Sequence, residues 1–120
     1  MFFNDRIREL PENHPRRIAF EQAEQERLTS PAYVEREVVL QAQSMLDSFA
    51  RTRGYDGILS ACSYVSSAVP QFAAEAARCV TLRDQVWATC YTIMAAVKAG
   101  TRTMPTVEQA ISELPALTWE

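Results

Sequence analysis

The sequence has few of the residues that catalysis, metal binding or a disulfide framework require. Its 120 residues include one histidine, His14, and three cysteines, Cys62, Cys79 and Cys90. His14 lies in a charged, proline-broken segment where no rigid scaffold would hold it beside a nucleophile, so hydrolase chemistry is not expected. The cysteines lack a C-x-x-C pair and a histidine cluster, which favours buried, reduced thiols over a zinc site. We therefore predict a protein that is not an enzyme and takes no cofactor or metal.

The sequence also lacks any concentration of charge of one sign. The formal net charge is −3, and no block of five like charges occurs, so nucleic acid and anionic membranes are not expected as partners. The N-terminus carries charges at Asp5, Arg6, Arg8 and Glu9 and has no apolar region typical of a secretory signal. No uncharged run is both long and apolar enough to span a bilayer. These features predict a soluble, cytoplasmic protein.

The first 30 residues differ in composition from the rest of the chain. They hold 11 of the 27 charged residues and are broken by Pro11 and Pro15. A short helix over residues 16–28 would have few apolar side chains to bury, so this segment is either loosely attached or ordered by a partner. The sequence thus predicts a charged N-terminal arm or short helix over residues 1–30 and a single helical domain over residues 31–120.

Local signals divide the domain into helices. Ser30 and Pro31 predict a helix start, and Gly54 predicts its end after about Thr52. An apolar stripe at helical spacing follows from that start and comprises Val34, Val38, Ala42, Met45, Leu46 and Phe49. Asp56 is expected to cap a second, shorter helix that extends to about Val65.

The C-terminal half is dominated by one long periodic stretch. Pro70 opens this stretch and Gly100 ends it, with Thr81 as a position where it either continues or breaks into two helices. Thr106 to Gln109 has the capping-box pattern of a last short helix. No segment alternates in the manner of a strand. The fold class predicted is all-α, a small bundle of about four to five helices with a long central helix over about residues 70–99.

Aromatic residues are the main candidates for binding. Trp87 continues an apolar row on the long helix, so a core position is favoured for it, with an aromatic binding patch as the alternative. Trp119, near the C-terminus, must either dock on the domain or anchor a partner. Tyr91, Ile93 and Met94 place apolar side chains on more than one face of the long helix, which favours a homo-oligomer or a hetero-complex.

Three segments together resemble the C-terminal domain of tailed-phage tail fibre assembly or tail-associated proteins. They are ARTRGYDGILSACSY at 50–64, VPQFAAEAARCVTLRDQVWATCYTIMAAVKAGTRTMPT at 69–106, and LPALTW at 114–119. The resemblance covers about residues 50–119. It implies a non-enzymatic helical protein of phage morphogenesis that binds a tail or tail-fibre protein in the host cytoplasm, as a chaperone does. The alternative is a structural subunit retained in the virion tail.

The candidate partner-binding residues are Tyr55, Asp56, Trp87, Tyr91 and Trp119. At the corner between the first two helices of the domain, Arg83 and Asp84 of the long helix are expected to pair with Asp56 or Arg53. Tyr55 is expected to lie over the alanine-rich face of that helix. This corner is either a purely structural element or a knob that a partner recognises.

Overall fold

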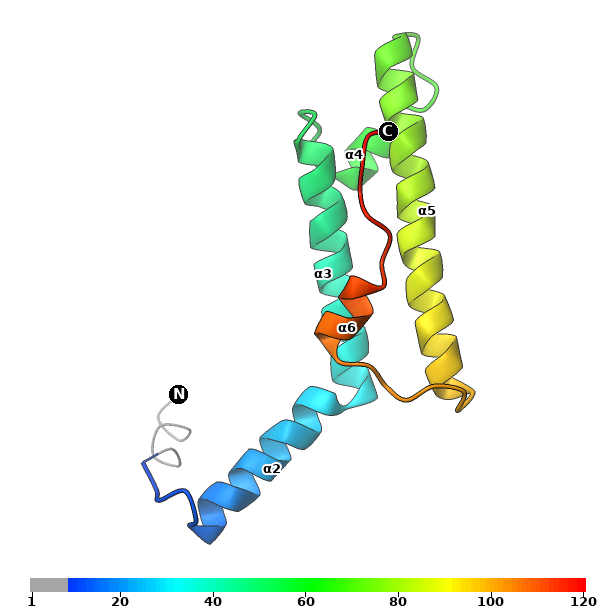
Figure 1. Cartoon of the computed structure of the whole chain (residues 1–120). Helices are drawn as coiled ribbons and strands as arrows, with labels where there is room; N and C mark the ends of the chain where they lie inside the picture. The colour runs from blue at the N-terminus through cyan, green and yellow to red at the C-terminus, as the bar shows by residue number, and fades with distance from the viewer. Residues whose placement is uncertain (1–8) are drawn as a thin grey trace.

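The computed structural model describes residues 9–120, and within this range it contains helices and no strand (Figure 1). The helices are α2 (Pro15–Thr29), α3 (Pro31–Arg51), α4 (Ile58–Cys62), α5 (Pro70–Lys98) and α6 (Val107–Ser112). The predicted all-α fold and the long helix near residues 70–99 are confirmed. None of the helices in the described part of the chain is long and apolar enough to cross a membrane.

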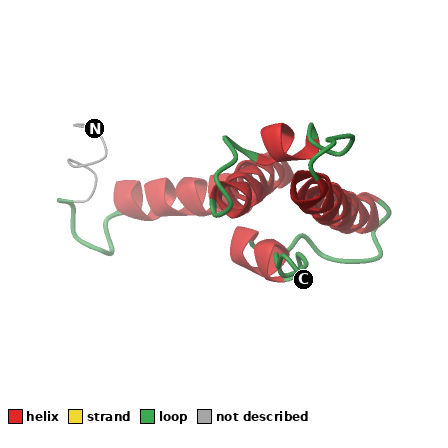
Figure 2. Ribbon diagram, turned by 90° about the horizontal axis from the view of Figure 1, so that it is seen from above, coloured by secondary structure: helices red, strands yellow, loops and turns green. Residues whose placement is uncertain are grey.

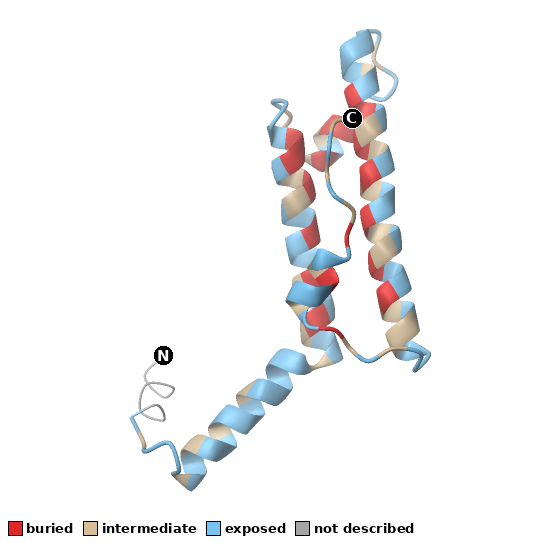
Figure 3. Ribbon diagram, viewed as in Figure 1, coloured by how far each residue is buried: buried red, intermediate tan, exposed pale blue. Residues whose placement is uncertain are grey.

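Helices α3 and α5 form the central layer of the bundle. Viewed from above, α4 lies on one face of this layer, and α6 lies on the other face with the C-terminal tail (Figure 2). Buried residues concentrate on the sides of α3 and α5 that face each other (Figure 3). The core is built from the residues Val34, Val38, Ala42, Leu46, Phe49, Ala50, Ile58, Ala61, Cys62, Cys79, Leu82, Val86, Cys90, Ile93, Ala110 and Leu114.

The local signals for helix ends are confirmed. The Ser30 hydroxyl accepts a hydrogen bond from the backbone N–H of Tyr33 and caps α3. Gly54 and Gly100 both adopt positive φ, at 87° and 78°, a conformation that costs a residue with a Cβ roughly 1 kcal/mol or more. Thr106 and Gln109 form the predicted capping box at the start of α6.

The cap of α4 differs from the prediction. Asp56 does not cap this helix; the carboxylate of Asp47, in α3, accepts the hydrogen bond from the backbone N–H of Ile58 at 2.9 Å. Gly57 allows this approach, because a Cβ at that position would lie 2.9 Å from the Asp47 carboxylate oxygen. The cap therefore ties α4 to the side of α3, which a cap from the preceding residue would not do.

Helix α5 is continuous through Thr81, whose hydroxyl donates to the carbonyl of Ala77 without breaking the helix. Ile93, one of the residues behind the prediction of more than one apolar face, is 3% exposed and belongs to the core, as does Leu82. The reason is that α5 packs against both α3 and α4, so that more than one of its faces is buried. Part of the apolar surface of α5 is therefore already buried within the monomer.

Helix α2 projects from the end of the bundle where α3 begins (Figure 1). It forms over the region where a short helix was predicted, and a His14 ring nitrogen accepts a hydrogen bond from the backbone N–H of Arg16 as its cap. None of its residues is buried. The proposed division between residues 30 and 31 stays a prediction, and residues 1–8 of the predicted arm lie outside the described residues.

Candidate functional site

The predicted partner-binding residues fall into two groups at opposite ends of the α3–α5 layer. Tyr55, Asp56 and Trp119 lie at the corner where α3 ends and α5 begins. Trp87 and Tyr91 lie further along α5, on the wall of an open groove. The structure therefore brings together three of the five residues at one place and two at another, and it does not join the two groups.

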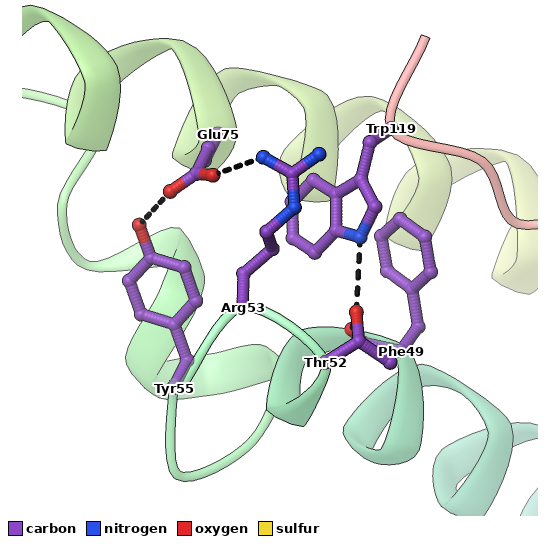
Figure 4. Close-up of polar contacts among 6 residues, drawn as sticks. All are labelled: Phe49, Thr52, Arg53, Tyr55, Glu75 and Trp119. Carbon is purple, nitrogen blue, oxygen red and sulfur yellow. Dashed lines mark hydrogen bonds and ion pairs between the residues drawn. The ribbon is translucent and has the colours of Figure 1, made fainter.

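A buried carboxylate organises the corner (Figure 4). Glu75, in the first turns of α5, is only 8% exposed. It accepts hydrogen bonds from Arg53 Nη1 at 2.6 Å and from the Tyr55 hydroxyl at 2.9 Å. A buried charge is tolerated only when it is paired and hydrogen-bonded in this way. Glu75 thus joins the loop after α3 to the start of α5.

Trp119 completes the corner from the C-terminal tail. Its ring stacks on Phe49 with 4.2 Å between centroids, and its indole N–H donates to the Thr52 hydroxyl at 3.0 Å. The Arg53 guanidinium lies 4.8 Å from the centroid of the Trp119 ring, a distance at which a cation–π attraction operates. The tail therefore docks on the domain, and we name the set Phe49, Thr52, Arg53, Tyr55, Glu75 and Trp119 the corner cluster.

The protonation states at the corner follow from these contacts. Burial alone would raise the pKa of Glu75, but the hydrogen bonds from Tyr55 and Arg53 and the charge of Arg53 outweigh it and hold that pKa below its usual range. Burial, followed by the hydrogen bond to Glu75, raises the pKa of Tyr55 to about 12. At neutral pH the corner therefore holds a charged carboxylate beside a neutral phenol, which is a stable structural pairing.

Two of the ion pairs expected at the corner are absent there. Arg83 pairs with its neighbour Asp84, and Arg53 pairs with Glu75 instead of with either of them. The geometry of α5 explains this, because Arg83 lies two turns, about 12 Å, beyond Glu75 along the helix axis. Asp56 takes part only through its backbone carbonyl, which accepts from the Arg51 guanidinium at 2.9 Å.

Sequence reasoning also missed Glu75. The Tyr55 hydroxyl reaches this residue within the alanine-rich first part of α5, and the Tyr55 ring packs against Tyr64 at 5.5 Å between centroids. The available signal for Glu75 was its position as a lone acid within an otherwise uncharged, alanine-rich stretch, one residue before the buried Ala76. A buried acid is almost always paired, so an isolated acid in such a stretch is a candidate for a buried ion pair.

The segment that follows the first part of the corner cluster in the chain is uncharged and carries several exposed apolar side chains. Residues 57–74 contain no charged side chain. Half of the large exposed hydrophobic residues among the described residues lie within this run; they are Leu59, Tyr64, Val65, Val69 and Phe72, which we name the tip surface. Two of them are joined to the corner, since the Tyr64 ring contacts Tyr55 and also contacts Phe72, at 5.7 Å between centroids.

The second candidate surface is a groove between the first turns of α3 and the second half of α5. It has a volume of about 410 Å³. We name it the α3–α5 groove; its lining residues are Glu35, Val38, Val39, Trp87, Cys90, Tyr91, Met94, Ala95 and Lys98. Trp87 is half-buried against the core, as favoured from its position in the apolar row, whereas the Tyr91 side chain is 78% exposed.

The cysteines are free and buried, in agreement with the prediction of reduced thiols. Burial raises the pKa of all three thiols, and that of Cys79 rises to about 11. The thiols are therefore neutral at physiological pH and poor nucleophiles. Within residues 9–120, no three histidine, cysteine or acidic side chains are grouped so that they could hold a metal ion.

The chemistry available at both surfaces is accordingly that of apolar contact and aromatic packing. Comparison of the chain with protein-family models, curated proteins and solved structures finds no match.

Proposed function

We propose that this chain is a non-enzymatic bacteriophage tail protein that binds a tail or tail-fibre protein during virion assembly, as a chaperone does. The resemblance of residues 50–119 to tail fibre assembly proteins supports the biological setting. The observation that carries the binding role is the tip surface, five large exposed apolar side chains in a run of residues without charge. Exposed apolar patches with polar surroundings are typical of protein interaction sites.

The tip surface is suited to binding because the corner cluster holds it in place. Tyr55 is fixed by its hydrogen bond to Glu75, and its ring supports Tyr64, which in turn contacts Phe72. Aromatic side chains that are already ordered lose little entropy on association. Tyr55 and Trp119 therefore contribute to binding mainly by positioning, and Tyr64 and Phe72 by direct contact.

The exposed area of these side chains is sufficient for an interaction site. Together the five side chains expose on the order of 450 Å². Buried area does not convert directly into affinity, because association costs translational, rotational and side-chain entropy. The contacts of the individual side chains therefore decide how tightly a partner binds.

The test is co-expression with the tail or tail-fibre polypeptide encoded in the same phage genome. The wild-type chain should raise the soluble yield of that polypeptide and copurify with it. Leu59→Asp should weaken binding about 30-fold, as expected when a charge replaces the most exposed apolar contact of the tip surface. Leu40→Asp is the matched control, because Leu40 is exposed on α3 outside the tip surface and the groove lining. An unchanged yield, or equal effects of the two variants, would contradict the proposal.

The second candidate, a structural subunit retained in the mature tail, is favoured by α2. This helix has no buried residue in the monomer, as expected of a segment that becomes ordered against a neighbouring subunit. Mass spectrometry of purified virions separates the two candidates. A chaperone should be missing from the particles, whereas a structural subunit should be present in a fixed ratio to the major tail protein.

A further inference from the structure

Helix α2 is exposed to a degree that a stable helix of its length rarely shows. It has 15 residues, and none of them is buried. Isolated helices of this length are marginal in water even when their sequence favours helix. The apolar side chains of Ile18 and Leu28 are 40% and 38% exposed. A partner surface that covers α2 would supply the missing burial.

The α3–α5 groove is an open, mainly apolar surface of the same chain. None of its lining residues comes from α4 or α6. Helix α4 lies near the upper end of α3 in Figure 1, whereas the groove is lined by the first turns of α3. Helix α6 lies on the face of the layer opposite to α4 (Figure 2). The side chains of Val39 and Tyr91 are therefore left exposed at 44% and 78%. The groove is long enough to take a further helix.

A second copy of the chain would account for both surfaces at once. The helix without buried residues and the groove belong to the same chain, and both lie at the end of the bundle where α3 begins. In a two-fold pair, one contact made twice would cover two α2 helices and two grooves. A standard interface needs about 800 Å² from each partner, and the repeated contact adds its area twice.

We propose that two copies of the chain form a two-fold dimer in which α2 of each copy lies in the α3–α5 groove of the other. Helix α2 is long enough to span the groove, because α2 is about 22 Å long and the groove wall from Trp87 to Lys98 runs for about 16 Å along α5. The charges are also compatible. Glu35 and Lys98 at the rim form no ion pair among residues 9–120, and α2 carries three arginines and three glutamates.

Within one chain, α2 is not suited to fill the α3–α5 groove of the same bundle. Only Ser30 separates α2 from α3, and its hydroxyl both caps α3 and donates to the carbonyl of Arg27 at the end of α2. The Arg27 guanidinium also lies 5.6 Å from the centroid of the Tyr33 ring. Folding α2 back on its own bundle would break these contacts. If α2 of each copy lies in the groove of the other copy, the contacts are kept and both grooves are filled.

The first test measures the mass of the full chain in solution by light scattering. We expect twice the 13.5 kDa of one chain at micromolar concentration, and a dissociation constant raised about 30-fold by Tyr91→Asp. Leu59→Asp is the matched control, because Leu59 is 79% exposed and lies on the tip surface; it should leave the dimer unchanged. A wild-type monomer at all concentrations, or equal effects of the two variants, would overturn the proposal.

The second test locates α2 in the dimer. A photoreactive p-benzoylphenylalanine placed at position 91 should cross-link to residues 15–29 of the other copy, identified by mixing isotopically labelled and unlabelled chains. Cross-links to residues 57–72, to position 91 of the other copy or within one chain would contradict the exchange of α2. The outcome is separate from that of the proposed function, since partner binding is tested at Leu59 and dimerisation at Tyr91.

Discussion

Replacing the corner carboxylate by an amide, Glu75→Gln, should destabilise the protein by about 2 kcal/mol. Glu75 accepts one hydrogen bond from the Tyr55 hydroxyl and one from Arg53. A hydrogen bond to a charged group contributes about 1.5–3 kcal/mol, but the Arg53 side chain is 46% exposed, so its ion pair contributes less than about 1 kcal/mol. The side-chain oxygen of the substituted glutamine can still accept one of these two hydrogen bonds. Its NH₂ group is itself a donor, so the other donor loses its acceptor.

Urea denaturation followed by circular dichroism measures this change as a shift in midpoint at constant slope. The same loss should lower the melting temperature by roughly 8 °C, at about 4 °C per kcal/mol for a chain of this size. Asp84→Asn is the matched control, because Asp84 is an exposed acid on the same helix and, among residues 9–120, it pairs with Arg83 alone. Equal effects of the two substitutions, each below about 0.5 kcal/mol, would refute a stabilising role of Glu75.

The difference between wild type and Glu75→Gln should also depend on pH. Because the pKa of Glu75 is lower in the folded state, its stabilising effect is complete above the unfolded pKa of about 4.3 and is lost as the pH falls through the folded value. At high pH, the Tyr55 pKa of about 12 exceeds the unfolded value, so its contribution is present below about pH 10 and is lost between about pH 10 and 12. A difference that stays constant from pH 7 to 3 would contradict the charged state assigned to Glu75.

Three further predictions follow from single contacts. Asp47→Ala should destabilise the protein by about 1 kcal/mol in urea, since the Asp47 carboxylate caps α4 at Ile58, whereas Asp47→Asn should retain most of that stability. Trp119→Ala should cost about 2 kcal/mol by loss of stacking on Phe49, and the fluorescence of the remaining tryptophan should follow the same urea transition. The three buried thiols should react with a disulfide reagent at least about 100-fold more slowly in the folded protein than in urea.

The start of α3, the ends of α3 and α5, and the start of α6 are predictable because their signals are local, unlike the cap of α4, which comes from another helix. The Ser30 cap, the glycines at 54 and 100, and the Thr106 capping box each act within four residues of the position that they determine. Their effects on backbone geometry do not depend on the rest of the fold. The buried face of α3 is equally predictable from the sequence, since the buried residues of this helix recur at helical spacing on one side.

The packing faces of α5 are less predictable. This helix is covered on two sides, so apolar residues occur around most of its circumference, and periodicity alone does not separate the buried Ile93 from the exposed Tyr91. The corner cluster is also hidden from sequence reasoning. Its contacts join Arg53 to Glu75, 22 residues away, and Thr52 to Trp119, 67 residues away. Such pairs depend on how the helices are placed in space, for which a single sequence carries no local signal.

The two proposals together imply how the molecule would act. The tip surface lies at the end of the bundle where α5 begins, and α2 leaves the opposite end (Figure 1). A dimer joined through α2 and the groove would therefore leave both tip surfaces free, and a partner that is itself oligomeric would meet two of them at once. Bivalent attachment raises the apparent affinity by 10²- to 10⁴-fold without any new contact. Tyr91→Asp should then weaken binding to an oligomeric partner while its affinity for a single partner chain stays unchanged, and equal losses for both partner forms would mean that the groove contacts the partner directly.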